Sequence, residues 1–175
     1  MGSGILPATI YNNKLYFLFG KERRGLNSIG YSDFGGSKEN DESYLKTAIR
    51  EGSEELCGFL GSDKDIEKIL KLNGTYNIDY NNRYRCHIFP IIYDPKLVVY
   101  FNNNHKFIKK YLSSEIIIHS KIYEKEKIEW ICIDDLIKFK KKFRNHFQFI
   151  TQSIFNQKEE INKFIRKGLG LSVKK

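Results

Sequence analysis

The sequence predicts an α/β protein made of one domain. Short apolar runs that end in Asn- or Gly-rich turns predict strands, and apolar residues at helical spacing predict helices between and after them. The chain has 175 residues, of which 41% are hydrophobic and 14% aromatic, which is enough for one packed core. Neither a repeat nor a linker divides the chain, so we expect a single domain over residues 1–175.

Two β-hairpins are expected in the first half of the chain, each around an Asn-Asn turn. Their strands are residues 5–11 and 15–19, then 74–80 and 84–93. Helices are predicted within 36–58, where Leu45, Ala48, Ile49 and Leu56 share one face, and within 62–72. Residues 1–4 resemble a cloning remnant, and we exclude them from the fold.

The second half is predicted to add short strands at 97–101 and 116–119, on either side of a short helix at 105–112. A further strand around Trp130 precedes an acidic pair, Asp134-Asp135, that opens a helix. The region from Lys138 toward Arg166 has the pattern of an amphipathic C-terminal helix. Residues 168–175 are expected to form a flexible tail.

The densest acidic group lies at the end of the predicted helix within 36–58. Residues three and four apart share a helix face, so Glu51, Glu54 and Glu55 are expected to converge on one small volume. Carboxylates that close repel one another unless a cation lies between them, and Mg²⁺ or Mn²⁺ prefers such oxygen ligands. A solvated acidic helix face would have the same spacing, but the preceding Gly35-Gly36 and the nearby Glu42 favour a site.

The same stretch resembles the signature of the Nudix hydrolases, G-x5-E-x7-R-E-U-x-E-E-x-G-U, in which U is a bulky aliphatic residue. The residues at the required spacing are Gly36, Glu42, Arg50, Glu51, Glu54 and Glu55. The resemblance implies an α/β/α sandwich with a mixed β-sheet and hydrolysis of a P–O–P bond with Mg²⁺ or Mn²⁺. It implies metal binding by Glu51, Glu54, Glu55 and the Gly36 carbonyl, while Arg50, held by Glu42, fixes the acidic helix.

Three positions depart from this signature. Gly52 stands where an aliphatic residue is usual, Cys57 where Gly is usual, and Gly58 where the last aliphatic residue is usual. We expect the helix to end one residue late, with Gly58 as its left-handed cap. Gly52 is expected to allow the close approach of backbone or substrate.

The proton acceptor is expected to be a glutamate, either within the signature or in the loop at 124–129. In the family, a glutamate from the loop before a Trp-bearing strand binds metal or acts as general base, and the segment 124–136 resembles that part. The candidates are Glu124, Glu126 and Glu129, and we assign Glu126 to the catalytic group although the sequence does not choose among them. The alternative for each of these glutamates is a solvated surface charge without a catalytic role.

The net charge of +9 would steer a polyanion such as RNA toward the protein. The Lys-, Asn- and Ile-rich composition of an AT-rich genome explains the charge equally well. The cations expected to bind substrate are Arg23, Arg24, Arg83, Arg85, Lys141 and Arg144. The alternative is that they belong to an exposed turn, ordinary strands and the solvated face of a C-terminal helix.

Function is predicted from the resemblance. The segment 36–51 is similar to the box of mRNA-decapping Nudix enzymes of large DNA viruses, so removal of the mRNA cap as m7GDP is the first prediction. The alternatives are hydrolysis of a small nucleotide (a dinucleotide polyphosphate, ADP-ribose or an oxidised dNTP) and a non-catalytic Nudix module that binds RNA or nucleotide. The expected partner is therefore capped RNA or a nucleotide, and the oligomeric state is left open.

The expected location is the cytoplasm, or the host cytoplasm for a viral protein. The three cysteines are odd in number and widely spaced, which is typical of reduced thiols. The sequence has neither a secretory signal nor an apolar run long enough to span a membrane, so no membrane partner is expected.

Overall fold

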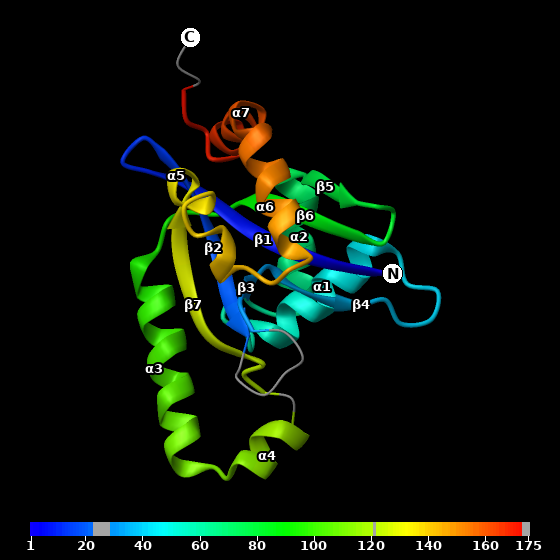
Figure 1. Ribbon diagram of the computed structural model, residues 1–175, viewed down its shortest axis with the longest axis vertical. Helices are drawn as coiled ribbons and strands as arrows, with labels where there is room; N and C mark the ends of the chain where they lie inside the picture. Colours follow the sequence, from blue (N-terminus) through cyan, green and yellow to red (C-terminus); the bar gives the residue numbers. More distant parts are fainter. Residues whose placement is uncertain (23–28, 121, 173–175) are drawn as a thin grey trace.

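The computed structural model describes residues 1–22, 29–120 and 122–172. Within these residues, seven strands form one sheet between two layers of helices (Figure 1). The strands are β1 (Gly2–Tyr11), β2 (Lys14–Glu22), β3 (Tyr31–Ser32), β4 (Phe34–Ser37), β5 (Tyr76–Tyr80), β6 (Tyr84–Pro90) and β7 (Lys125–Cys132). The helices are α1 (Tyr44–Glu55), α2 (Asp63–Asn73), α3 (Pro95–Tyr111), α4 (Ser114–His119), α5 (Ile133–Leu136), the short 3-10 helix η1 (Lys140–Lys142), α6 (Phe147–Asn156) and α7 (Lys158–Gly168).

Strand β1 lies at the centre of a mixed sheet. It pairs antiparallel with β2 and β4 along one side and parallel with β6 along the other, and the strand order is β3-β2-β1-β6-β5. Strand β7 continues the sheet beyond β2. Helix α3 is attached to β7 because the Asn102 side chain both accepts from the Ile128 N–H and donates to the Ile128 carbonyl.

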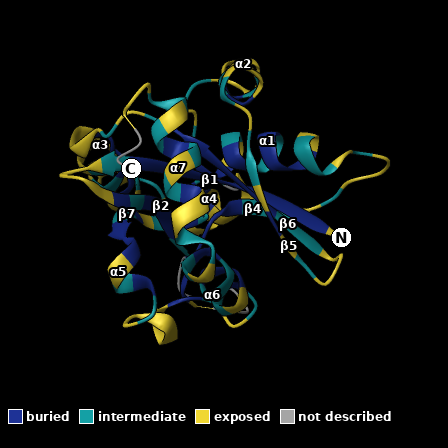
Figure 2. Ribbon diagram, turned by 90° about the horizontal axis from the view of Figure 1, so that it is seen from above, coloured by how far each residue is buried: buried dark blue, intermediate teal, exposed yellow. Residues whose placement is uncertain are grey.

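The two faces of the sheet carry separate apolar cores. Successive strand residues point to opposite faces, so Ile5 packs under α1 and α2 while Leu6 packs under α6 and α7. Figure 2 shows α1 and α2 on one side of the sheet and α6 on the other. This layered packing fulfils the expectation of an α/β/α sandwich.

Both predicted hairpins are confirmed. Asn12 and Asn13 have φ values of 48° and 61°, and Asn81 and Asn82 have 49° and 53°. Two consecutive residues with positive φ form the type I′ turn that suits the right-handed twist of paired strands, and Asn tolerates this conformation well. Local sequence therefore sets both turns.

The two short strands predicted in the second half are wrong. Residues 97–101 lie inside helix α3, and residues 116–119 lie inside α4. Both helices begin at capping residues: Asp94 accepts from the Lys96 N–H before Pro95, and Ser113 accepts from the Ile116 N–H. These caps override the β preference of the apolar runs that follow them.

Both ends of the chain also differ from expectation. Gly2–Gly4 are buried and pair with β4 and β6, so excluding residues 1–4 from the fold is wrong. The C-terminal helical region is divided into η1, α6 and α7, with a break at Gln157. Gly168 ends α7 and Leu169 packs against the core, so the expected tail does not begin at 168, and 173–175 lie outside the described residues. No helix in the described ranges is long and apolar enough to cross a membrane.

Candidate active site

Helix α1 presents an apolar face to the sheet and an acidic face to a cleft. Ser43 caps its first turn, and Ala48, Ile49 and Leu56 are buried against β1 as predicted. The cleft has a volume of 840 Å³ and is bordered by α1, β4, the end of β2 and the segment before β7. The signature residues Gly36, Arg50, Glu51, Glu54 and Glu55 all line this cleft.

The end of α1 differs from the sequence prediction. Leu56 is the C-cap, and the next residue, Cys57, already has a positive φ of 50°. The Cys57 N–H donates to Glu54 and the Gly58 N–H to Ser53, which is the Schellman pattern. The helix therefore ends where the family signature places its glycine, although Cys57 occupies that position. The predicted left-handed conformation of Gly58 is confirmed by its φ of 74°, whereas the predicted extension of the helix by one residue is wrong.

Gly52 is required by the packing of α1 on β1. A Cβ at this position would lie 2.3 Å from the Cδ1 atom of Ile5. The close neighbour is therefore a core side chain of β1, and not backbone or substrate as predicted.

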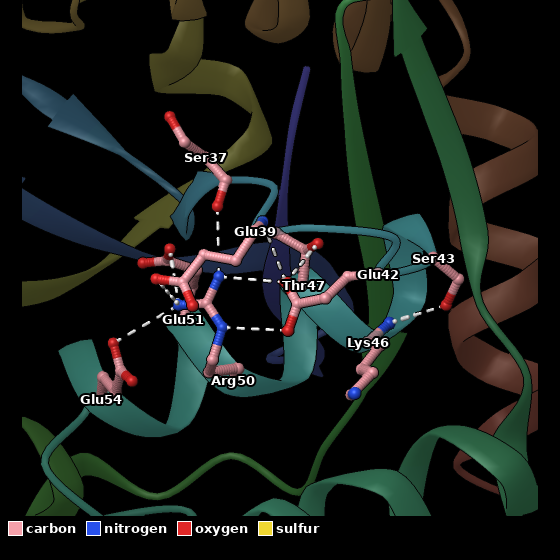
Figure 3. A network of polar contacts seen from close by, with 9 residues as sticks. All are labelled: Ser37, Glu39, Glu42, Ser43, Lys46, Thr47, Arg50, Glu51 and Glu54. Atoms are coloured by element: carbon pink, nitrogen blue, oxygen red, sulfur yellow. Dashed lines mark hydrogen bonds and ion pairs between the residues drawn. The ribbon is translucent and has the colours of Figure 1, made fainter.

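Arg50 joins the loop before α1 to the acidic face of the helix (Figure 3). Its Nε and Nη2 donate to the two carboxylate oxygens of Glu42 at 3.2 and 3.1 Å, and Nη1 donates to Glu51 at 2.9 Å. Nη2 also donates to the Ser37 carbonyl at 3.1 Å. The arginine holds the pKa of Glu42 down to about 2. This is the geometry expected of a residue that fixes the acidic helix.

The three signature glutamates line one cleft, as predicted, but they do not form one group of metal ligands. In the described part of the chain, no three acidic, His or Cys side chains are grouped as ligands of one ion. Arg50 holds Glu51, while the Glu54 side chain is 58% exposed and its carboxylate lies 3.7 Å from Arg50. Glu55 is directed to the interior, where its side chain is 6% exposed.

Glu55 belongs to a buried group of charges that we call the inner cluster: Glu22, Glu55, Lys125 and Arg144. The Lys125 ammonium contacts Glu22 and lies 3.1 Å from Glu55, and the Arg144 guanidinium lies 2.9 Å from Glu22. The second Glu55 oxygen accepts from the Gly35 N–H at 2.8 Å. Two carboxylates and two cations balance each other in this cluster.

Burial and charge pairing act in opposite directions on the pKa values of Glu55 and Lys125. Burial raises the pKa of Glu55, whereas Lys125 and the Gly35 N–H act in the opposite direction. The pKa of Lys125 is raised because attraction to Glu55 and Glu22 outweighs its own burial. Lys125 is therefore a buried ammonium group that the carboxyl groups of Glu55 and Glu22 stabilise.

Nearer the solvent, a second group of carboxylates, the outer cluster, consists of Glu51, Glu54 and Glu124. All three line the cleft. Burial raises the pKa of Glu51, and repulsion from Glu54 and Glu124 adds to this, while Arg50 opposes it. Because Arg50 is already paired with Glu42, the outer cluster carries excess negative charge.

The outer cluster has the donor chemistry that a divalent cation prefers, although its three carboxylates are not drawn together as ligands of one ion. Its donors are carboxylate oxygens, which Mg²⁺ and Mn²⁺ prefer, and among the described residues Arg50 balances only part of its charge. Gly36 makes room for it, since a Cβ there would lie 2.5 Å from the Glu51 Oε2 atom. Glu55 is less suited as a ligand, because one oxygen accepts from the Gly35 N–H and the other faces the Lys125 ammonium group, which would repel a divalent ion.

The carbonyl of Gly36 faces strand β1. A Cβ at Gly2 would lie 2.6 Å from this oxygen, and Gly36 pairs in register with Ser3. Metal binding by the Gly36 carbonyl stays a prediction that this geometry does not favour.

Of the three loop glutamates, Glu124 is the one that lines the cleft. Glu126 lies on β7 and pairs with Lys21 at 2.6 Å, while Glu129 accepts from the Tyr31 hydroxyl at 2.6 Å. The structure thus places Glu124 beside the signature glutamates and the assigned Glu126 away from them.

The expected substrate-binding cations are dispersed. Arg144 lines the cleft, whereas Arg85 pairs with Asp79 at 2.6 Å. Arg83 is exposed in the turn between β5 and β6, and Lys141 is exposed in η1. Arg23 and Arg24 lie outside the described residues.

The sequence matches no protein-family model and no curated protein. Solved structures do match: a Nudix hydrolase from M. smegmatis, RenU, is 11% identical with a TM-score of 0.50, over 92% of this chain and 87% of that one. The chain has the Nudix fold. A C. elegans Ap4A hydrolase (15% identity, TM-score 0.42, 97% and 94% of the two chains) and a Methanosarcina mazei MutT protein (14%, 0.47, 91% and 94%) are more loosely similar.

The sequence does not identify Glu22 and Lys125 as site residues. They form the buried ion pair of the inner cluster. The two residues are 103 positions apart and meet because β2 and β7 pair with Glu22 opposite Lys125. Lys125 lies in the sequence Glu124-Lys125-Glu126-Lys127, which has the pattern of a solvated strand edge. The local sequence does not distinguish Lys125 from Lys127. Lys125 is buried because β7 pairs with β2 at Glu22.

Proposed function

We propose that this protein is a metal-dependent hydrolase that cleaves a phosphoanhydride bond in a nucleoside diphosphate-linked substrate. The observation that carries the proposal is the outer cluster, whose unbalanced carboxylates line an 840 Å³ cleft of a Nudix fold. A cleft of this size admits a nucleotide. Mg²⁺ or Mn²⁺ held by Glu51, Glu54 and Glu124 would neutralise phosphate charge and lower the pKa of a bound water.

The residues of the chain have separate tasks in this proposal. Arg50 fixes the Glu51 carboxylate at the cleft wall, and Glu42 fixes Arg50. Glu124 is placed to accept a proton from an attacking water, with Glu54 as the alternative within the signature. Arg144, at the inner end of the cleft, is placed to bind a phosphate oxygen.

Capped RNA is our first proposed substrate. The net charge of +9 favours a polyanion. Lys140 and Lys141 are exposed and lie four and three residues before Arg144, which lines the cleft, and we propose that they extend the binding surface for RNA outside the cleft. A 5′ RNA chain that leaves the cleft along η1 would meet these lysines.

A small nucleotide is the second candidate, and the dispersion of the basic residues favours it. Arg83 and Arg85 do not line the cleft, and Arg85 is paired with Asp79, so the arginines of the β5–β6 hairpin do not border the site. A free dinucleotide polyphosphate, ADP-ribose or an oxidised dNTP would need only the cleft itself.

Hydrolysis assays with Mg²⁺ or Mn²⁺ test both candidates. Cap-labelled RNA is compared with free cap dinucleotide, dinucleotide polyphosphate, ADP-ribose and oxidised dGTP, each with wild type and with Glu54→Gln. Release of m7GDP from RNA with poor cleavage of free nucleotides supports decapping. Rapid cleavage of one free nucleotide with intact capped RNA supports the second candidate, and no cleavage of any substrate contradicts an enzymatic role.

A further inference from the structure

The inner cluster contains a cation that belongs to the chain itself. Glu55 is one of the signature glutamates expected to bind metal, yet its carboxylate faces a buried ammonium group at 3.1 Å. That ammonium belongs to Lys125, which is fully buried and lies directly across from Glu22 in the pairing of β2 with β7.

We propose that Lys125 acts as a built-in cation that positions Glu55 and Glu22 and keeps Glu55 out of metal coordination. Divalent ions are then bound by the outer cluster alone: Glu51, Glu54 and Glu124. This inference rests on the proposed metal-dependent function, because it states which carboxylates of that site remain for the metal.

The surroundings of Lys125 are built for an ammonium group. Its three N–H donors have three acceptors, Glu22, the Ser32 hydroxyl at 2.9 Å and Glu55 at 3.1 Å. An ammonium group has three donors, so this set satisfies it completely. A buried charge is tolerated only when it is paired and hydrogen-bonded in this way.

The chain also makes room for the lysine stem. A Cβ on Gly20 would lie 2.7 Å from Cγ of Lys125 and 2.8 Å from its Cδ, so the stem crosses β2 where that strand has no side chain. The position of Lys125 is therefore supported by three features from separate parts of the sequence: the glycine, the pairing with Glu22 and the Ser32 hydroxyl.

Glu55 is fixed from both sides. The Gly35 N–H holds one oxygen at 2.8 Å and Lys125 faces the other. A divalent ion that took Glu55 as a ligand would have to approach the Lys125 ammonium group, and like charges repel. Among the described residues, Glu51 and Glu54 pair with the Arg50 guanidinium and not with a buried ammonium group.

The test counts Mn²⁺ ions on the full chain without substrate, by electron paramagnetic resonance of the free ion during titration. Glu55→Gln and Glu51→Gln form a matched pair on one helix. We expect Glu55→Gln to bind as many ions as wild type with unchanged affinity, and Glu51→Gln to bind about 10-fold more weakly or to lose an ion. Loss of an ion in Glu55→Gln would overturn the inference.

Lys125→Met is the second variant. It keeps the apolar stem and leaves Glu22, Glu55 and the Ser32 hydroxyl as three oxygen donors, so we expect it to bind one Mn²⁺ more than wild type. A folded Lys125→Met with the wild-type count contradicts the inference, and if this variant does not fold, the matched pair decides. Wild type that binds no Mn²⁺ overturns the proposed function, whereas loss of an ion in Glu55→Gln overturns only the role of Lys125.

Discussion

Glu54 and Glu55 are neighbours in sequence, but Glu54 belongs to the exposed outer cluster and Glu55 to the buried inner cluster. The Glu54 side chain is 58% exposed at the cleft, whereas that of Glu55 is 6% exposed beside Lys125. One residue along a helix is a rotation of about 100°, which here separates an outer cluster with excess charge from an inner cluster with balanced charge. The comparison shows that two glutamates of the same signature differ in role because different cations lie beside them: Arg50 near Glu54 and Lys125 near Glu55.

The largest expected effect comes from breaking the inner cluster. Lys125→Met leaves two buried carboxylates without an ammonium partner, and we expect it to lower the free energy of unfolding by about 3–5 kcal/mol. Urea unfolding of wild type and variant measures this difference.

The matched control is Lys127→Met on the same strand. Lys127 is exposed and pairs with Glu129 at 2.7 Å, so we expect a change of about 1 kcal/mol or less. Equal effects of the two substitutions would show that the inner cluster does not depend on its lysine.

The next largest effect concerns the outer cluster. Glu54→Gln removes a charge from the cleft, and we expect hydrolysis to fall about 10²–10⁴-fold, as is usual when a group that transfers protons is lost. Because the side chain is mainly exposed, stability should change by about 0.5 kcal/mol or less. Steady-state rates and thermal unfolding measure the two effects. A variant that loses stability and activity together would contradict the separation of the clusters.

A third prediction distinguishes the loop glutamates. Glu124 lines the cleft as the proposed proton acceptor and Glu126 pairs with Lys21, so Glu124→Gln should lower hydrolysis about 10²–10⁴-fold and Glu126→Gln should leave it nearly unchanged. The two variants carry the same chemical change two residues apart and are assayed side by side. A greater loss of activity in Glu126→Gln than in Glu124→Gln would show that Glu126, on β7, belongs to the site in place of Glu124.

Local sequence was sufficient for some parts of this structure. The Asn-Asn turns, the apolar face of α1 and the bond from Arg50 to Glu42 depend on residues close together in the chain, and each is found as predicted. The same local rules failed at residues 97–101, where an apolar β-branched run suggested a strand and the preceding Asp94-Pro95 cap produced a helix.

The inner cluster could not be predicted from the sequence. The spacing of Glu51, Glu54 and Glu55 predicts one shared face, but Glu55 turns inward because Lys125 and Gly35 bind it. These partners come from β7 and from the segment before α1, and only the packing of the sheet brings them to Glu55. Helical spacing predicts which face of the helix a side chain occupies, but it does not predict which charged groups from other elements lie beside it.

The smallest expected effect concerns Arg50 and Glu42, which support the outer cluster from the loop. The pKa of Glu42 is lowered from 4.5 to about 2, so the pair stabilises the fold above pH 4.5 and this contribution disappears as the pH falls through about 2. Glu42→Gln should therefore have a shallower decline of melting temperature between those pH values. Glu67→Gln, in an exposed pair with Lys71, should retain the wild-type slope, and identical slopes for all three proteins would contradict the role of Arg50.

The most direct test of the two-cluster description is a crystal structure with Mn²⁺, in which anomalous scattering locates the ions. We predict peaks against Glu51 and Glu54, with Glu124 as the nearest loop carboxylate, and the Lys125 ammonium between Glu22 and Glu55. A peak that bridges Glu55 and Glu22, with Lys125 displaced, would contradict this description.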